Sequence, residues 1–292
     1  MALSDPFIII NTLLSGVLLG GMLALTALGL SIVLGVMRLV NLAHGELLVV
    51  GAYAGLFLLM WTGIDPLLLL PLIGLGVGAG GYLVYIALLR PIAHRGPEAP
   101  MMTTFGLSVI AQNLFVALLS ADTRSIDRPY ASVPLELGAI SVPQVYIIGF
   151  AIAVVVILVV HFMIAHTRFG RDLRASTDDP RAAAIIGVNV GRVHALTFAL
   201  GAAAAGIGGT LMGIAFSFTP ATGATYLLTD FAIIVLGGLG SVVGTLVGGI
   251  AIGLIQSLGG LVFGDGYRDL AGFLMFLLVL ALRPKGFLRE RG

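Results

Sequence analysis

Long apolar stretches without a charged residue fill most of this chain. Eight can be delimited, at residues 6–37, 47–64, 66–89, 99–121, 137–167, 193–229, 231–264 and 270–282. A helix that crosses the hydrocarbon core of a bilayer needs about 20 mostly apolar residues, and most of these stretches are that long. None of them alternates polar and apolar residues in the way that a membrane barrel requires.

The composition points to the same class. Of the 292 residues, 59% are hydrophobic and 10% are charged, whereas a soluble domain carries about 25% charged residues. A soluble fold would lack the polar side chains to cover its surface. We therefore expect an all-α integral membrane protein with about eight or nine spans, which form a single transmembrane domain over residues 1–292.

Basic residues predict which side of the membrane each connection faces. Twelve of the 15 Lys and Arg residues fall in four groups: Arg38; Arg90 and Arg95; Arg168, Arg171, Arg174, Arg181 and Arg192; and Arg283, Lys285, Arg289 and Arg291. The positive-inside rule places these groups in the cytoplasm, so the N-terminus is expected outside and the C-terminus inside. Since no basic residue precedes Arg38, the first apolar stretch is interpreted as a retained span rather than a cleaved signal peptide.

Several classes of function are excluded by missing residues. The chain has no cysteine and a net charge of +1, which removes thiolate chemistry and argues against a nucleic-acid partner. It has no G-x-x-x-x-G-K-[ST] sequence, no His-rich metal signature and no Gly-x-Ser-x-Gly elbow. We expect a protein that is not an enzyme, binds no cofactor and cannot hydrolyse ATP by itself.

A polar segment at residues 35–46 separates the first two apolar stretches. It contains Asn41, His44 and Glu46, and on a helix Asn41 and His44 would share a face. Polar and ionisable groups inside a membrane usually face a bundle interior or a water-filled path. These side chains therefore either line or gate a transport route, or they hydrate a helix start at the cytoplasmic interface. Gln112 and Asn113, inside another stretch, either bond to a neighbouring helix or line a path.

The basic connection at residues 166–193 contains the pattern of a short isolated helix. The residues concerned are Asp178, Asp179, Pro180, Arg181, Ala182, Ala183, Ile185, Ile186 and Gly187. Asp179 can cap the helix start, Pro180 suits its first position, and Gly187 suits a left-handed stop. A helix this short is not stable alone, so it must dock either in a groove of a cytoplasmic partner or on its own bundle or the headgroups.

Glycines interrupt or line the later stretches. Gly237, Gly238 and Gly240 predict a turn between two short or tilted helices, and no Lys follows them as a phosphate loop requires. Other glycines recur four residues apart, at Gly74 and Gly78, Gly76 and Gly80, Gly240, Gly244 and Gly248, and Gly249 and Gly253. Such spacing allows close helix packing, which serves either the bundle itself or an interface with a second subunit or a gate.

Taken together, four of these pieces resemble a known family in order and spacing. They are residues 40–47 followed by Gly51-Ala52-Tyr53, residues 171–187 with the Asp-Pro-Arg-Ala-Ala core, residues 236–241, and the tail Arg283-Pro284-Lys285-Gly286. Across nearly the whole chain this set resembles the permease of bacterial branched-chain amino acid ABC importers, specifically its H-type membrane subunit.

The resemblance implies a permease fold of the vitamin-B12 and ribose importer type in the bacterial inner membrane. It also implies a second homologous permease, two cytoplasmic ATPases that bind ATP and Mg, and a periplasmic substrate-binding protein. The short helix would be the coupling helix, although Arg181 stands where such permeases often carry Glu and no I-x-L-P follows. The substrate would be a branched-chain or other hydrophobic amino acid, or alternatively urea, a short amide or an aromatic acid.

One further class stays open from the residues alone. His44 and Glu46 could serve as proton or substrate ligands of a stand-alone secondary transporter or channel. An intramembrane enzyme is disfavoured because the sequence offers no nucleophile and base pair and no paired intramembrane carboxylates.

Overall fold

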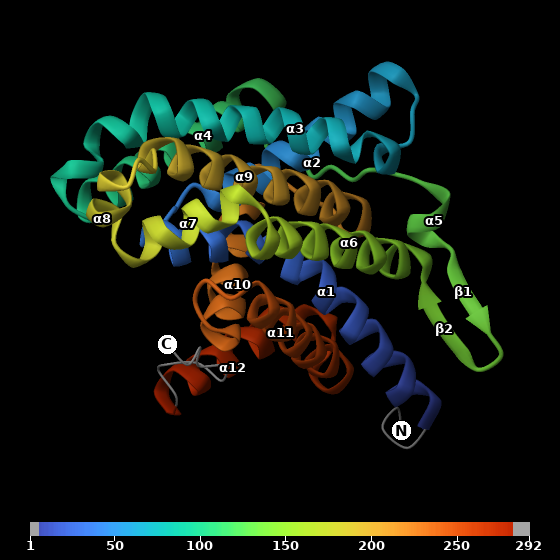
Figure 1. Ribbon diagram of the computed structural model, residues 1–292. Helices are drawn as coiled ribbons and strands as arrows, with labels where there is room; N and C mark the ends of the chain where they lie inside the picture. Colours follow the sequence, from blue (N-terminus) through green and yellow to red (C-terminus); the bar gives the residue numbers. More distant parts are fainter. Residues whose placement is uncertain (1–5, 283–292) are drawn as a thin grey trace.

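The computed structural model describes residues 6–282, and helices account for most of them (Figure 1). The helices are α1 (Pro6–Met37), α2 (His44–Thr62), α3 (Pro66–Val84), α4 (Glu98–Leu119), α5 (Pro129–Ser132), α6 (Gln144–His166), α7 (Arg168–Asp178), α8 (Pro180–Ile185), α9 (Val190–Ala215), α10 (Thr222–Gly237), α11 (Val242–Phe263) and α12 (Arg268–Leu282). A π-helical turn, η2 (Tyr85–Leu89), and a 3-10 helix, η3 (Arg90–Arg95), continue α3, while η4 (Asp265–Tyr267) precedes α12.

Seven of these segments are long and apolar enough to cross a membrane: α1, α2, α3 with its extension, α4, α6, α9 and α11. The shorter apolar helix α10 brings the number to eight among residues 6–282, within the predicted eight or nine spans, and the 15-residue α12 follows α11 at the end of the described chain. The all-α prediction missed one small feature, an antiparallel pair formed by β1 (Pro134–Leu137) and β2 (Ile140–Pro143). This hairpin is too short to be told from a loop by periodicity.

Helix α1 forms the centre of the bundle. In Figure 1 it runs between a layer of α2, α3 and α9 on one side and α10, α11 and α12 on the other. Sixteen of its 32 residues are buried. A side chain at Gly20 would collide with the backbone of Gly249 and Ile250 on α11, so only glycine permits this approach.

Helix α9 is packed just as tightly. A Cβ at Gly209 would overlap the backbone of Leu48 on α2, and one at Gly201 would meet Gly29 on α1. Gly74 and Gly78 of α3 also face α9, so their spacing serves packing within the chain.

Most of the remaining glycine pairs also pack against another helix of this chain. Gly244 and Gly248 pack against α10, and Gly249 and Gly253 pack against α1. Gly76 and Gly80 differ from the other pairs singled out from the sequence, because a Cβ added at either would have no described atom within 4 Å. These two glycines face outward, and close packing inside the bundle explains most of the pattern.

The predicted turn between two helices is present at residues 237–241. Helix α10 ends at Gly237 and α11 begins at Val242, where Ser241 caps the start by accepting from the backbone N–H of Gly244 at 3.0 Å. Gly238 and Gly240 have φ angles of 92° and 82°, which glycine adopts without strain. Gly240 rests against Gly35, near the end of α1, so the turn lies at the same end of the bundle as Arg38.

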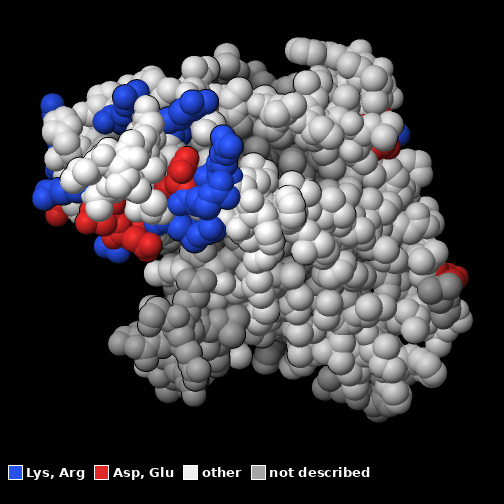
Figure 2. Space-filling model, in the orientation of Figure 1, with Lys and Arg blue, Asp and Glu red and all other residues white. Residues whose placement is uncertain are grey.

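Charged side chains gather at one end of the molecule, around α7 and α8, in the face that Figure 2 shows. The middle of this face is nearly uncharged, and a few acidic groups appear toward the end that carries the hairpin. This distribution has the form that the positive-inside rule describes. The tail residues Arg283, Pro284, Lys285 and Gly286, with Arg289 and Arg291, lie outside the described residues.

Candidate functional site

A turn before α2 carries three polar residues back into the bundle. After α1 ends, Arg38 adopts a φ of 50° and the Asn41 side chain accepts a hydrogen bond from the backbone N–H of Ala43 at 3.1 Å. Helix α2 then begins at His44. The expectation that Asn41 and His44 share a helix face is therefore wrong, because the Asn41 amide bonds to the local backbone and precedes the helix.

These three side chains are almost completely enclosed by protein. Asn41, His44 and Glu46 are exposed by only 2%, 1% and 5%. His44 reaches α1 at Thr26 and Gly29, about two to three helical turns before α1 ends at Met37. The structure thus places His44 well inside the bundle rather than at its charged end.

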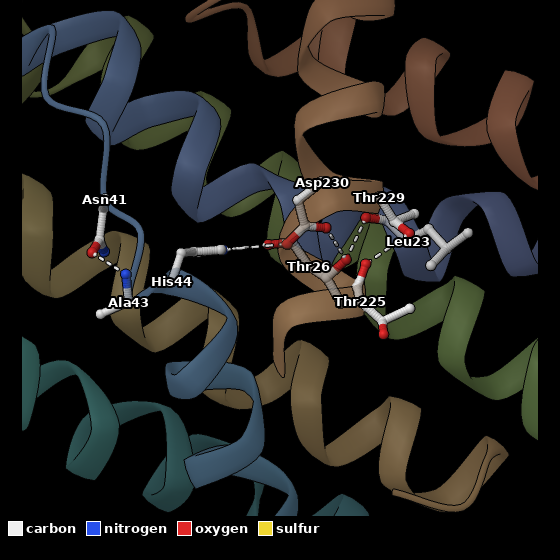
Figure 3. A network of polar contacts seen from close by, with 8 residues as sticks. All are labelled: Leu23, Thr26, Asn41, Ala43, His44, Thr225, Thr229 and Asp230. Carbon is white, nitrogen blue, oxygen red and sulfur yellow. Dashed lines mark hydrogen bonds and ion pairs between the residues drawn. The ribbon is translucent and has the colours of Figure 1, made fainter. Parts of the chain in front are cut away.

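His44 meets a carboxyl group that belongs to α10. Its Nε2 lies 2.9 Å from the backbone carbonyl oxygen of Thr26 and 3.6 Å from Oδ2 of Asp230 (Figure 3). A carbonyl oxygen can only accept, so Nε2 carries the hydrogen. The contact joins α1, α2 and α10 at one buried point.

The hydroxyl group of Thr26 completes the network. Its oxygen lies 2.7 Å from Oδ1 of Asp230 and 2.7 Å from the backbone carbonyl oxygen of Leu23. One hydroxyl hydrogen cannot serve both acceptors fully. A neutral Asp230 carboxyl would donate to Thr26 and let Thr26 donate to Leu23, so that each hydroxyl hydrogen has one acceptor of its own.

Glu46 forms a second polar contact on the other side of α2. Its Oε1 accepts a hydrogen bond from the Ser108 hydroxyl of α4 at 3.2 Å, and Gly223 of α10 packs close to the same oxygen. Among residues 6–282, no hydrogen-bond donor reaches Oε2 of Glu46 or Oδ2 of Asp230. Buried carboxyl oxygens without a partner are costly in a membrane and usually mark a functional site.

Asp230 was missed as a candidate from the sequence, although a signal was present. It is the only Asp, Glu, Lys or Arg between Val193 and Gly264, where it merely separated two apolar stretches. A lone carboxyl group in such a stretch indicates a buried partner, but only the fold shows that the partners are Thr26 and His44.

Gln112 and Asn113 do not join this network. Both lie on α4, where Gln112 is half-buried and Asn113 is exposed. The Asn113 amide donates to the backbone carbonyl of Val109 on its own helix at 2.8 Å. Within the described part of the chain, neither residue bonds to another helix.

The short helix α8 has the predicted caps. The Asp179 carboxylate accepts from the backbone N–H groups of Arg181 and Ala182 at 2.8 and 3.1 Å, and Gly187 adopts a φ of 93°. Ile185 and Ile186 are 86% and 77% exposed. The helix thus presents a rigid apolar pair at the charged end of the molecule.

Its neighbouring residues have distinct positions. Asp178 ends α7, Pro180 starts α8, and Ala183 is buried against the rest of the chain.

No group of three or more His, Cys, Asp and Glu side chains is placed to hold a metal ion among residues 6–282.

Two curated bacterial proteins are similar to this chain over nearly their whole lengths. The high-affinity branched-chain amino acid transport system permease protein BraD of Pseudomonas aeruginosa is 30% identical, with 96% of this chain and 95% of BraD covered. The corresponding protein LivH of Escherichia coli K12 is also 30% identical, over 98% of this chain and 97% of LivH. The permease protein LivM of the same strain is 25% identical, and the alignment covers 99% of this chain and 72% of LivM.

A solved structure supports the fold. PsaBC from Streptococcus pneumoniae, in complex with Fab, aligns with a TM-score of 0.51 at 15% identity, over 97% of this chain and 94% of that chain. The family model described as branched-chain amino acid transport system / permease component matches residues 12–282. The chain therefore belongs to the family of membrane permease components of branched-chain amino acid transport systems.

Proposed function

We propose that this chain is the H-type permease subunit of an ATP-driven importer in the bacterial inner membrane. It forms half of the translocation path for branched-chain or other hydrophobic amino acids, which a periplasmic binding protein delivers. Its membership of the permease family and its similarity to BraD and LivH support this proposal. Its C-terminus lies in the cytoplasm, as the distribution of basic residues suggests.

The observation that carries the proposal is the exposed apolar pair on α8. A six-residue helix has no stability of its own, yet α8 is capped at both ends and anchored by Ala183. Ile185 and Ile186 face outward beside α7, whose charged residues keep this surface out of the hydrocarbon. An apolar pair held rigidly in water is suited to a groove on a partner protein, here a cytoplasmic ATPase.

The remaining partners follow from this arrangement. Two ATPase subunits bind ATP and Mg, one beneath each permease, and this chain binds no cofactor itself. The second permease is a homologue, and the similarity of this chain to LivM as well as LivH supports such a pair. Helix α4, with few buried residues and exposed Met102, Phe105 and Ile110, offers an apolar face for that subunit or for lipid.

The buried network provides a point at which the bundle can change shape. Thr26, His44 and Asp230 connect α1, α2 and α10, and α10 ends in the glycine turn at the same end as α8. Movement of α8 by the ATPase would tilt these helices and remake the contacts. Asn41, His44, Glu46, Gln112 and Asn113 remain candidates for the path, and Gly237, Gly238 and Gly240 for its gate or helix break.

Reconstitution tests the proposal. The tagged chain is purified gently from its native membrane, partners are identified by mass spectrometry, and the recovered complex is placed in liposomes. We expect two ATPase subunits, a second permease, and leucine uptake that requires both ATP and the binding protein. Recovery of the chain alone, with ATP-independent uptake, would instead favour a secondary transporter that uses His44 and Glu46. ATP-dependent uptake of urea, short amides or aromatic acids, but not leucine, would retain the importer and change its substrate.

A further inference from the structure

A cavity of about 340 Å³ lies between α1, α10, α11 and α12, beside the end of α9 and the starts of α10 and α12, and it reaches the middle of α1. Its size lies at the lower end of the range for small-molecule sites, about 300–1,000 Å³. Its lining comes from α1, from residues 212–229 and from residues 256–269, so only the folded bundle creates it.

Hydroxyl groups of Ser217, Thr222, Thr225, Tyr226 and Thr229 line part of the cavity, and another part is apolar. Leu19 and Leu23 of α1 contribute to it, together with Met212 at the end of α9 and Phe216 just after it. These side chains can surround a branched aliphatic group without offering it a hydrogen bond. Such a wall favours a substrate with one compact apolar end.

The cavity lining also carries three charged residues, Asp265 of η4 and the adjacent Arg268 and Asp269. Arg268 and Asp269 both line the cavity at the start of α12. The Asp269 Oδ1 accepts a hydrogen bond from the Gln256 amide at 3.3 Å, which orients the carboxylate. Arg268 lies beside Asp265, with Nε 3.8 Å from Oδ1, but within the described residues this Nε has no hydrogen-bond acceptor. This Nε is enclosed by protein, whereas the Arg268 side chain as a whole is 29% exposed and lines the cavity.

The floor of the cavity joins the buried network. Leu23 lines the cavity and its carbonyl accepts from Thr26, while Thr229 lines the cavity next to Asp230 (Figure 3). A molecule in the cavity therefore contacts Leu23 and Thr229, which neighbour the residues that connect α1, α2 and α10. Binding of a molecule in the cavity can therefore shift Leu23 or Thr229 and, through them, the contacts of Thr26 and Asp230.

We propose that this cavity is a recognition site for aliphatic α-amino acids in their zwitterionic form. Arg268 binds the carboxylate, Asp269 binds the ammonium group, and the wall of Leu19, Leu23, Met212 and Phe216 takes the side chain. The permease then contributes selectivity of its own, in addition to any binding protein. This inference rests on the proposed function, since it names the residues that would recognise the substrate of that path.

Uptake by the reconstituted complex tests the charge assignment. We expect Arg268→Gln to raise the apparent KM for leucine about tenfold or more, because a charge-assisted bond contributes about 1.5–3 kcal/mol. Arg268→Lys should recover part of the affinity, since it keeps the charge but loses the planar fork. Arg95→Gln and Asp122→Asn, at exposed positions away from the cavity, serve as matched controls.

A binding measurement without delivery or turnover provides the second readout. Saturation-transfer NMR on the complex in nanodiscs compares leucine with leucinamide, which lacks the carboxylate, and with 4-methylpentanoate, which lacks the ammonium group. The wild type should bind leucine in preference to both, and Arg268→Gln should lose the preference over leucinamide. If leucine uptake is ATP-driven but Arg268→Gln and Asp269→Asn leave KM and ligand preference unchanged, the recognition site is refuted while the importer stands. If the wild-type complex takes up urea, a short amide or an aromatic acid but no amino acid, the recognition site is refuted while the importer stands. If it shows no ATP-driven uptake at all, both proposals fail.

Discussion

Two carboxyl groups, Asp230 and Glu46, lie inside the bundle, and each has one oxygen that no donor of residues 6–282 reaches. Asp230 is the more constrained, since it shares Thr26 with a backbone carbonyl and faces the N–H of His44. If Asp230 is a neutral acid, its hydroxyl group donates to Thr26, and the Thr26 hydroxyl is then free to donate to the Leu23 carbonyl. An ionised Asp230 would compete with the Leu23 carbonyl for the same hydrogen.

Substitutions at Asp230 distinguish these two states. Asp230→Asn keeps the shape and supplies an amide donor to Thr26, so uptake should stay within about threefold of the wild type. Asp230→Ala leaves Thr26 and His44 without this partner, which costs ~1–3 kcal/mol per buried group, so uptake should fall about tenfold or more. Initial rates in liposomes at equal protein content measure both. A loss in Asp230→Asn as large as that in Asp230→Ala would mean that the negative charge itself is required.

Asp65 illustrates a carboxylate with a different role, outside the spans. Burial tends to raise its pKa, but hydrogen bonds from the Leu67 N–H, the Tyr130 hydroxyl and Arg128 outweigh this, and the pKa of Asp65 is lowered. The Arg128 guanidinium lies 2.7 Å from its Oδ2. This group joins the start of α3 to the connection between α4 and α6 that contains α5.

The lowered pKa of Asp65 gives a pH dependence of definite sign. Because the folded pKa lies below that of the unfolded chain, about 3.9, the stabilisation is complete above that pH and disappears as pH falls through the folded pKa. Asp65→Asn should therefore lower Tm by a few degrees at pH 7, and the difference from the wild type should vanish under strong acid. Thermal unfolding in detergent between pH 7 and pH 3 measures it, with the exposed Asp122→Asn as control. A difference that grows on acidification would contradict the assigned sign.

The two features that the proposed coupling to an ATPase depends on are short elements, the helix α8 and the glycine turn between α10 and α11. Helix α8 has only six residues, yet its N-cap, its proline and its stop at Gly187 each satisfy a known local rule. These local features determine where the helix begins and ends. The exposed side chains of Ile185 and Ile186 form an apolar surface that a partner protein can contact. The glycine turn between α10 and α11 follows local rules as well, with Ser241 as the cap of the next helix.

The role of α8 can be tested by changing its exposed face or its stop. Ile186→Asp places a charge where an apolar groove is expected, and Gly187→Pro forbids the positive φ. Both should abolish ATP-driven uptake and uncouple the ATPase, while the protein still inserts in the membrane. Ile185→Val, which keeps the apolar surface, should retain most activity. Normal uptake by Ile186→Asp and Gly187→Pro would exclude α8 as the coupling element.

The molecule as a whole has a polarised charge distribution that predicts its orientation. The charged end carries α7 and α8, and the opposite end carries the hairpin and the proposed recognition cavity. An importer requires this arrangement, because the substrate arrives at one end and ATP acts at the other. The bundle between them is held by glycine contacts of α1 with α9 and α11.

Orientation can be measured cleanly because the chain has no cysteine. Single substitutions Glu136→Cys in β1 and Arg181→Cys in α8 place one thiol at each end. In intact cells stripped of their outer membrane, an impermeant maleimide should label Glu136→Cys at once and Arg181→Cys only after lysis. The reverse pattern would invert the topology and remove the support for a cytoplasmic α8.

Much of this protein follows from its sequence because the underlying rules are local. The length of an apolar stretch determines whether it can span a bilayer, and the caps around Asp179 and Gly187 lie within ten residues. The turn at Gly237–Ser241 was predictable for the same reason. Four motifs in order were enough to indicate the family, which the comparison over residues 12–282 established.

Tertiary structure alone decided which polar groups meet. Asp230 lies 204 positions from Thr26 in the sequence. In the pattern of apolar stretches it marked only the boundary between residues 193–229 and 231–264. The partners of His44, the inward turn at Asn41 and the cavity beside Arg268 depend on how α1, α2, α10 and α12 are placed around one another. Periodicity cannot encode these placements, because helices that are apolar on all sides give no moment to orient them, and close glycine contacts between distant segments set their rotation instead.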